Sequence, residues 1–97
     1  MMDKTPCVYI VTNRSNTTLY VGVTSNLYGR MLQHKERKYI GFTSRYNLDK
    51  LIYVEYCPTI QDAIQREKVI KKLSRANKEK LIVKENPLWI DLWETEK

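Results

Sequence analysis

A glutamate in the middle of a predicted apolar helix face is the first residue whose position suggests chemistry. With about 100° of rotation per residue, Glu67 falls within a stripe of four apolar side chains, Ile60, Ala63, Ile64 and Ile70. A carboxylate is costly on such a face unless it is paired with a cation or binds a metal ion. Two interpretations stay open. Glu67 is a metal ligand, or it is structural: either it forms a salt bridge with a neighbouring Lys or Arg, or the helix is rotated so that Glu67 lies at the edge of the stripe.

An arginine and the single histidine of the chain form a second candidate group. Arg30 and His34 are four residues apart and therefore share one face of a predicted helix, beside Leu27 and Met31. A guanidinium fork next to an imidazole suits a phosphate group. The alternative is an ordinary surface pair, because Arg and His at this spacing are common. A lone histidine also excludes a zinc site built from several histidines.

Two tyrosines on predicted neighbouring strands form the third group. Tyr9 and Tyr20 lie in β-branched and aromatic runs, where tyrosine usually packs its ring and leaves its hydroxyl in water. Packing alone would therefore explain them. Gly22, two residues after Tyr20, is unusual inside a strand, where glycine commonly marks the close approach of another backbone or of a ligand such as a phosphate. The predicted hairpin is therefore a candidate ligand-binding surface.

The elements that position these residues follow from hydrophobic periodicity and from turn and cap residues. The predicted strands are residues 7–11, 19–23 and 51–57, and the predicted helices are residues 27–36, 60–73 and 75–85. Residues 39–50 are expected to form a loop, and the tail, residues 88–93, is expected to fold back onto the core. The fold class is α+β: a single domain, residues 1–97, with a three-stranded antiparallel sheet flanked by helices.

The charge balance indicates a polyanionic partner. Lys and Arg number 17 against 11 acidic residues, giving a net charge of +6. Nucleic acid is the commonest partner of such a chain, although many small proteins are basic for solubility alone. The residues expected to contact nucleic acid are Lys35, Arg37, Lys38 and Arg45, with Tyr46 as a stacking platform.

Cysteine usage and hydropathy indicate a cytoplasmic protein. Cys7 and Cys57 lie in apolar runs, are too few for a disulfide framework and lack the spacing of a metal site. Both are expected to be buried free thiols. The sequence contains no apolar run that could span a membrane and no apolar signal core at its start, so we expect no membrane partner.

The three groups together resemble the GIY-YIG nuclease family. The resemblance rests on the segments Val8-Tyr9-Ile10 and Tyr20-Val21-Gly22, on Arg30, on His34 and on Glu67 in a later helix. It is closer to the small stand-alone bacterial members of the UPF0213 type, through residues 41–46, 66–68 and 85–89. The first motif reads Cys-Val-Tyr instead of Gly-Ile-Tyr, which keeps the tyrosine. Some repair-type members carry a lysine after the glycine of the second motif, where this chain has Val23.

The resemblance implies a metal-dependent endonuclease that hydrolyses phosphodiester bonds of nucleic acid, with DNA the favoured substrate and repair or recombination the expected setting. Glu67 would hold one divalent ion, Mg²⁺ or Mn²⁺. Arg30 would supply positive charge to the transition state, and His34 would accept a proton or bind phosphate. Tyr9 is the favoured general base, with Tyr20 bonding the phosphate or the water, but the reverse order stays open.

The alternative function is a non-catalytic module of the same fold that binds nucleic acid or a partner protein. Trp89 and Trp93 in the tail would then mark a docking surface. Many nucleases of this family carry a separate DNA-binding domain, which these 97 residues do not contain. A protein partner that confers specificity is therefore a further expectation under either function.

Overall fold

The computed structural model describes residues 4–36 and 46–96 of the chain. The elements within these residues are β1 (Cys7–Thr12), β2 (Leu19–Thr24), α1 (Leu27–Lys35), β3 (Lys50–Tyr56), α3 (Ile60–Lys71), α4 (Arg75–Glu85) and α5 (Trp93–Glu96). The predicted strands and helices are confirmed to within two residues at each end, whereas α5 was not predicted. None of the helices in the described residues is both long enough and apolar enough to cross a membrane.

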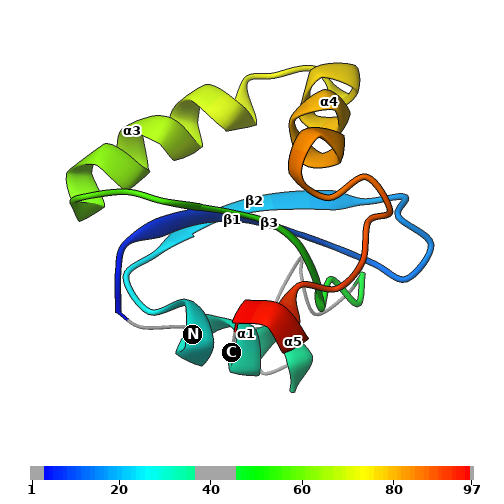
Figure 1. The fold of residues 1–97 in the computed structure, drawn as a ribbon, viewed down its shortest axis with the longest axis horizontal. Coiled ribbons are helices and arrows are strands. Elements are labelled where there is room, and N and C mark those ends of the chain that lie inside the picture. The colour runs from blue at the N-terminus through cyan, green and yellow to red at the C-terminus, as the bar shows by residue number, and fades with distance from the viewer. Residues whose placement is uncertain (1–3, 37–45, 97) are drawn as a thin grey trace.

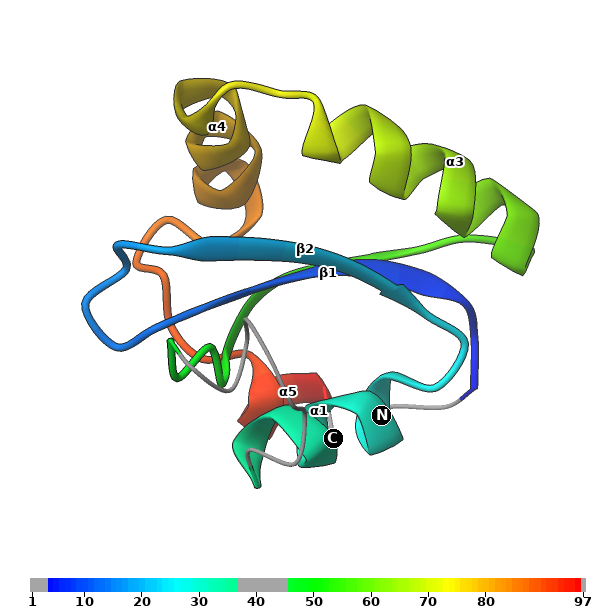
Figure 2. The ribbon, with the colours of Figure 1, turned by 180° about the vertical axis from the view of Figure 1, so that it is seen from behind.

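The three strands form one antiparallel sheet in the order β2-β1-β3, so β1 is the central strand. All six residues of β1 are buried, because helices cover both faces of the sheet. Figures 1 and 2 show α3 and α4 on one face, and α1 and α5 on the other. The α+β class, with a three-stranded antiparallel sheet flanked by helices, is therefore confirmed.

Side chains alternate between the two faces along each strand, and they form two apolar clusters. The cluster against α3 and α4 includes Val8, Ile10, Val21, Ala63, Ile70 and Ile82. The cluster against α1 includes Cys7, Tyr9, Val11, Leu27 and Met31. Cys57 joins the first cluster, and both cysteines are buried and free, as predicted. Tyr9 and Glu67 thus lie on opposite faces of the sheet.

Capping side chains set where the helices begin and hence which residues point toward the sheet. Each of the three long helices has a side-chain oxygen that accepts a hydrogen bond from a backbone N–H in its first turn, a contact that contributes about 1 kcal/mol. The three caps are Asn26 for α1, Thr59 for α3 and Ser74 for α4.

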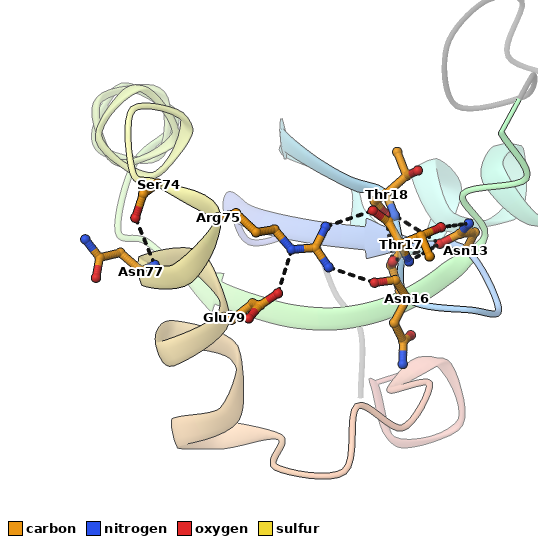
Figure 3. Close-up of polar contacts among 9 residues, drawn as sticks. Asn13, Asn16, Thr17, Thr18, Ser74, Arg75, Asn77 and Glu79 are labelled. Atoms are coloured by element: carbon orange, nitrogen blue, oxygen red, sulfur yellow. Dashed lines mark hydrogen bonds and ion pairs between the residues drawn. The ribbon is translucent and has the colours of Figure 1, made fainter.

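The turn between β1 and β2 is held to the start of α4 by one arginine (Figure 3). The Arg75 guanidinium donates to the carbonyl oxygens of Thr17 (2.9 Å) and Asn16 (2.7 Å), and its Nε donates to Glu79 at 2.7 Å. Asn16 has a positive φ of 59°, a conformation that asparagine tolerates better than most residues. The clamp fixes the far end of the hairpin that carries both motif tyrosines.

The tail folds back along β3, as predicted. The Leu92 N–H donates to the carbonyl of Leu51 (2.7 Å), and the Leu51 N–H donates to Asp91 (3.1 Å). Trp89 packs against the cluster under α3, and Trp93 stacks on Tyr28 of α1 with 5.4 Å between ring centroids. Both tryptophans therefore stabilise the fold, and the tail covers the outer edge of β3.

A buried asparagine anchors the start of this tail. Asn86 is 4% exposed; its Nδ2 donates to the carbonyls of Ile52 (3.1 Å) and Ile90 (2.9 Å), and its Oδ1 accepts from the Ile90 N–H. Asn86→Ala removes all three bonds and leaves the buried carbonyl of Ile52 without this donor. We expect it to lower the free energy of unfolding by about 2–4 kcal/mol in urea denaturation.

Asn77→Ala is the matched control for this prediction. Asn77 is exposed on α4, and its side chain points away from the sheet (Figure 3). The same chemical change there should alter stability by less than about 0.5 kcal/mol. Equal losses in the two variants would contradict the anchoring role of Asn86.

Candidate functional site

Tyr9 lies with its ring directly over Gly22. The two residues are partners in the β1–β2 ladder, so their side-chain positions share the face that α1 covers. A Cβ atom at position 22 would overlap Cζ and Oη of Tyr9. The close approach expected at Gly22 is therefore made by a side chain of the protein, and not by a backbone or ligand, because the tyrosine ring needs the space that a Cβ would occupy.

His34 lies next to Tyr9 in a row of three side-chain rings, those of Tyr9, His34 and Tyr20. The Tyr9 hydroxyl lies 3.2 Å from His34 Nε2, within hydrogen-bond distance, and the two rings meet edge to face. The His34 ring also lies 6.3 Å from that of Tyr20, centroid to centroid. Tyr9 is 0% exposed and His34 is 3% exposed, whereas Tyr20 is only partly buried. Of the two tyrosines, Tyr20 is thus the one open to solvent.

Burial keeps the imidazole of His34 neutral. Desolvation and, to a smaller extent, the positive charge of Arg30 lower the His34 pKa to about 4, and Asp49 acts in the opposite direction. A neutral ring has one donor and one acceptor nitrogen. His34 can therefore accept or donate a hydrogen bond at neutral pH, but its lowered pKa makes it a weak proton acceptor.

Arg30 lies one helical turn before His34, on the same face of α1, as predicted. Its Nη1 donates to the carbonyl of Val23 at the end of β2, at 3.5 Å. Its charge acts on His34, and the residue is partly exposed. The guanidinium therefore lies at the rim of the Tyr9–His34–Tyr20 row, along the β2 edge of the sheet.

Glu67 lies on the buried side of α3 but is paired with a cation. Its side chain is 13% exposed, and its Oε2 lies 2.8 Å from Nζ of Lys71, one turn along the helix. Ala63 and Ile70 are fully buried, whereas Ile64 is 37% exposed. The expectation that Ile64 belongs to the buried stripe is therefore wrong: the helix faces the sheet through Ala63 and Ile70. The salt bridge that competed with the metal ligand is present.

Lys71 is the partner of Glu67 on α3. The hydrogen bond to Glu67 is the main reason why the pKa of Lys71 is raised, and Tyr20 acts in the same direction. Because Tyr20 belongs to the α1 face and Glu67 to α3, the candidate residues lie on both faces of the sheet. Sequence reasoning missed Lys71, although its i,i+4 spacing from Glu67 was a signal for an ion pair.

The donor set of the site fits one class of metal ion. The described residues contain no group of three or more His, Cys, Asp or Glu side chains that could hold a metal, so Glu67 would bind an ion without a cluster of further protein ligands. Mg²⁺ and similar hard cations keep several waters and need only one or two carboxylates. The position already attracts positive charge, as the Lys71 contact shows. A largely hydrated Mg²⁺ or Mn²⁺ ion fits these residues.

The residues expected to contact nucleic acid are found in different settings. Lys35 donates to Asp91 at 2.5 Å and lies over the Trp93 ring, so it also holds the tail on α1. Tyr46 is 44% exposed and lines an open cavity of about 480 Å³ with Asn13 and Arg14. Arg37, Lys38 and Arg45 lie outside the described residues. Contact of these five residues with nucleic acid stays a prediction.

Gly22→Ala tests the packing of the Tyr9 ring. The added methyl group must displace the ring, and overpacking of this kind costs about 1–3 kcal/mol. We expect that loss in chemical denaturation. In a Tyr9→Leu background the ring is absent, so Gly22→Ala should cost much less, giving a coupling of about 1 kcal/mol or more. Strictly additive losses would show that the ring and Gly22 are not in contact.

The His34 pKa predicts a pH dependence of stability. The ordinary histidine pKa of 6.5 applies to the unfolded chain, and the folded value is about 4. As the pH falls below 6.5, the unfolded chain binds a proton that the folded protein does not, so stability is lost between pH 6.5 and pH 4 and is fully present above that window. From pH 7 to pH 5 we expect a loss of roughly 1–2 kcal/mol from this group.

His34→Gln isolates this effect, because the chain has no other histidine. Carboxylates titrate in both proteins, so the difference between the two pH profiles reports His34 alone. We expect the profile of the variant to be flatter from pH 7 to pH 5 in denaturation measured at each pH. Parallel profiles would mean that the pKa of His34 is the same in the folded protein as in the unfolded chain.

Comparison with known proteins identifies the family. A protein-family model described as the GIY-YIG catalytic domain matches residues 5–80. The chain is 40% identical over 81 residues to a UPF0213 protein of Syntrophus aciditrophicus, covering 82% of this chain and 91% of that protein. It is 35% identical over 78 residues to a UPF0213 protein of Natronomonas pharaonis, covering 80% and 91%.

A UPF0213 protein of Bacillus licheniformis is 38% identical over 74 residues, covering 76% of this chain and 75% of that protein. No solved structure matches the chain. The matched residues include both motif tyrosines, Arg30, His34 and Glu67. The chain therefore belongs to the GIY-YIG nuclease family, together with the small UPF0213 proteins.

Proposed function

We propose that this protein is a metal-dependent endonuclease that hydrolyses phosphodiester bonds, with DNA as the favoured substrate and repair or recombination as its setting. The observation that carries the proposal is the row of Tyr9, His34 and Tyr20 on the α1 face, with Arg30 of α1 beside it. Tyr20 comes from β2, Arg30 from α1 and Glu67 from α3, which covers the opposite face of the sheet. A tyrosine, a guanidinium and a carboxylate are the groups that hydrolysis of a phosphodiester requires.

Arg30 stabilises the transition state in this mechanism. Attack on a phosphodiester adds negative charge to oxygens that are already anionic, and a planar guanidinium can contact two of them. The partly exposed position of Arg30 at the rim leaves its fork within reach of a bound backbone. A divalent ion on Glu67, when bound, supplies further positive charge to the same phosphate and to the leaving oxygen.

Tyr20 is the better general base of the two tyrosines. A base must reach the attacking water, and the Tyr9 hydroxyl is buried against His34, whereas Tyr20 is partly exposed. This assignment reverses the order that the sequence favoured. Tyr9 and neutral His34 form a buried, hydrogen-bonded support beside Tyr20.

The experiment is a plasmid-nicking assay with Mg²⁺ or Mn²⁺ on the wild type and on Arg30→Lys. The lysine keeps the charge but loses the planar fork, so turnover should fall by about two orders of magnitude or more while DNA binding changes little. Arg14→Lys, at an exposed arginine in the β1–β2 turn, is the control and should nick normally.

Glu67→Gln provides a second arm, with Glu85→Gln on the exposed side of α4 as its control. We expect the first variant to lose nicking and the second to keep it. Near-normal turnover in Arg30→Lys would remove Arg30 from the site. A wild type that binds DNA but never nicks it would instead support the non-catalytic binding module, an alternative favoured by the pairing of Glu67 with Lys71.

A further inference from the structure

Glu67 and Lys71 form an ion pair, although each could bind another charged group: Glu67 a metal cation and Lys71 a phosphate anion. The distance from Lys71 Nζ to Glu67 Oε2 is 2.8 Å. The carboxylate is largely buried, with 13% of its side chain exposed, whereas the lysine side chain is 52% exposed. The pair is thus asymmetric: Glu67 is fixed against the sheet, and Lys71 reaches it from solvent.

A metal ion and the Lys71 ammonium cannot both bind the same oxygen of the Glu67 carboxylate. Two cations bound to one carboxylate lie only a few ångströms apart, and their repulsion is strong near a protein surface. A divalent ion on Glu67 therefore displaces Lys71, and Lys71 weakens metal binding by competing for the same oxygen. This step rests on the proposed role of Glu67 as the metal ligand.

The displaced ammonium stays near the site because its stem is tethered to α3. A lysine side chain is a flexible four-carbon stem with a compact charge at its end, and the helix that carries Lys71 packs against β2. Once Glu67 is occupied, a phosphate of a nucleic acid lying along the β2 edge is an anion that the ammonium can bind instead. Lys68 is also exposed on this helix, but the cation paired with Glu67 is Lys71.

We propose that Lys71 is an exchangeable counter-ion of the site: it pairs with Glu67 in the metal-free protein and moves to a backbone phosphate of the nucleic-acid substrate when a divalent cation binds Glu67. The exchange couples the two ligands. Metal binding releases a cation for the phosphate, and phosphate binding removes the competitor of the metal, so each ligand strengthens the binding of the other.

The first test measures metal binding without nucleic acid. Mn²⁺ is titrated into the wild type, Lys71→Gln and the control Lys68→Gln, and the rise in melting temperature is recorded. Because the competing ion pair is lost only in the first variant, its half-saturating Mn²⁺ concentration should fall by about fivefold. Lys68→Gln removes the same net charge and should behave like the wild type.

The second test measures the other half of the exchange. At saturating Mn²⁺, Lys71→Gln should bind a labelled DNA duplex more weakly, and the slope of log affinity against log salt should flatten by about one unit. Its kcat/KM for nicking should fall by about tenfold. Lys71→Arg keeps a long cationic side chain and should restore both properties toward wild-type values.

The outcomes separate this inference from the proposed function. If the wild type nicks DNA and Glu67→Gln does not, but Lys71→Gln matches Lys68→Gln in Mn²⁺ response and salt slope, the exchange is refuted and the nuclease stands. Looser Mn²⁺ binding in Lys71→Gln would also refute the exchange. If Mn²⁺ neither stabilises the wild type nor supports nicking, the proposed function is refuted, and the exchange is refuted with it.

Discussion

The contact between the Tyr9 ring and the backbone at Gly22 determines the arrangement of the whole site. The central strand has room for a buried tyrosine on its α1 face only because its ladder partner has no Cβ. The ring then brings its hydroxyl to His34 and fixes the depth at which α1 packs. With α1 placed in this way, Arg30 reaches the end of β2, and Tyr20 becomes the more exposed member of the row.

The two edges of the sheet are flanked by different parts of the chain, and this difference indicates where the site lies. The tail covers the outer edge of β3 through Asn86, Asp91 and Leu92. At the β2 edge, Arg30 of α1 reaches the Val23 carbonyl, and α3 packs against β2 from the opposite face of the sheet. A short edge strand flanked by cations suits an extended polyanion, since a nucleic-acid backbone can pass along it without entering a deep pocket.

The electrostatic state of the site depends on burial as much as on the residues present. His34 is neutral because desolvation outweighs the acidic neighbour Asp49, so the row beneath Tyr20 carries no fixed charge. Glu67 is paired with Lys71 at 2.8 Å, on a side of α3 that is largely covered. Among the described residues of the site, positive charge therefore lies on Arg30 at the rim and on Lys71 of α3.

The sequence by itself determined the elements, the family and the candidate residues, because these depend on local periodicity, caps and motif spacing. The strands and long helices were predicted to within two residues, and Tyr9, Tyr20, Arg30, His34 and Glu67 stood out by type and position. Only the tertiary structure decided what surrounds each one. The burial of Tyr9, the exposure of Ile64 and the choice of Lys71 as the partner of Glu67 depend on how α1 and α3 pack against the sheet. Helix rotation of that kind is set by contacts between residues far apart in the chain, which no local pattern records.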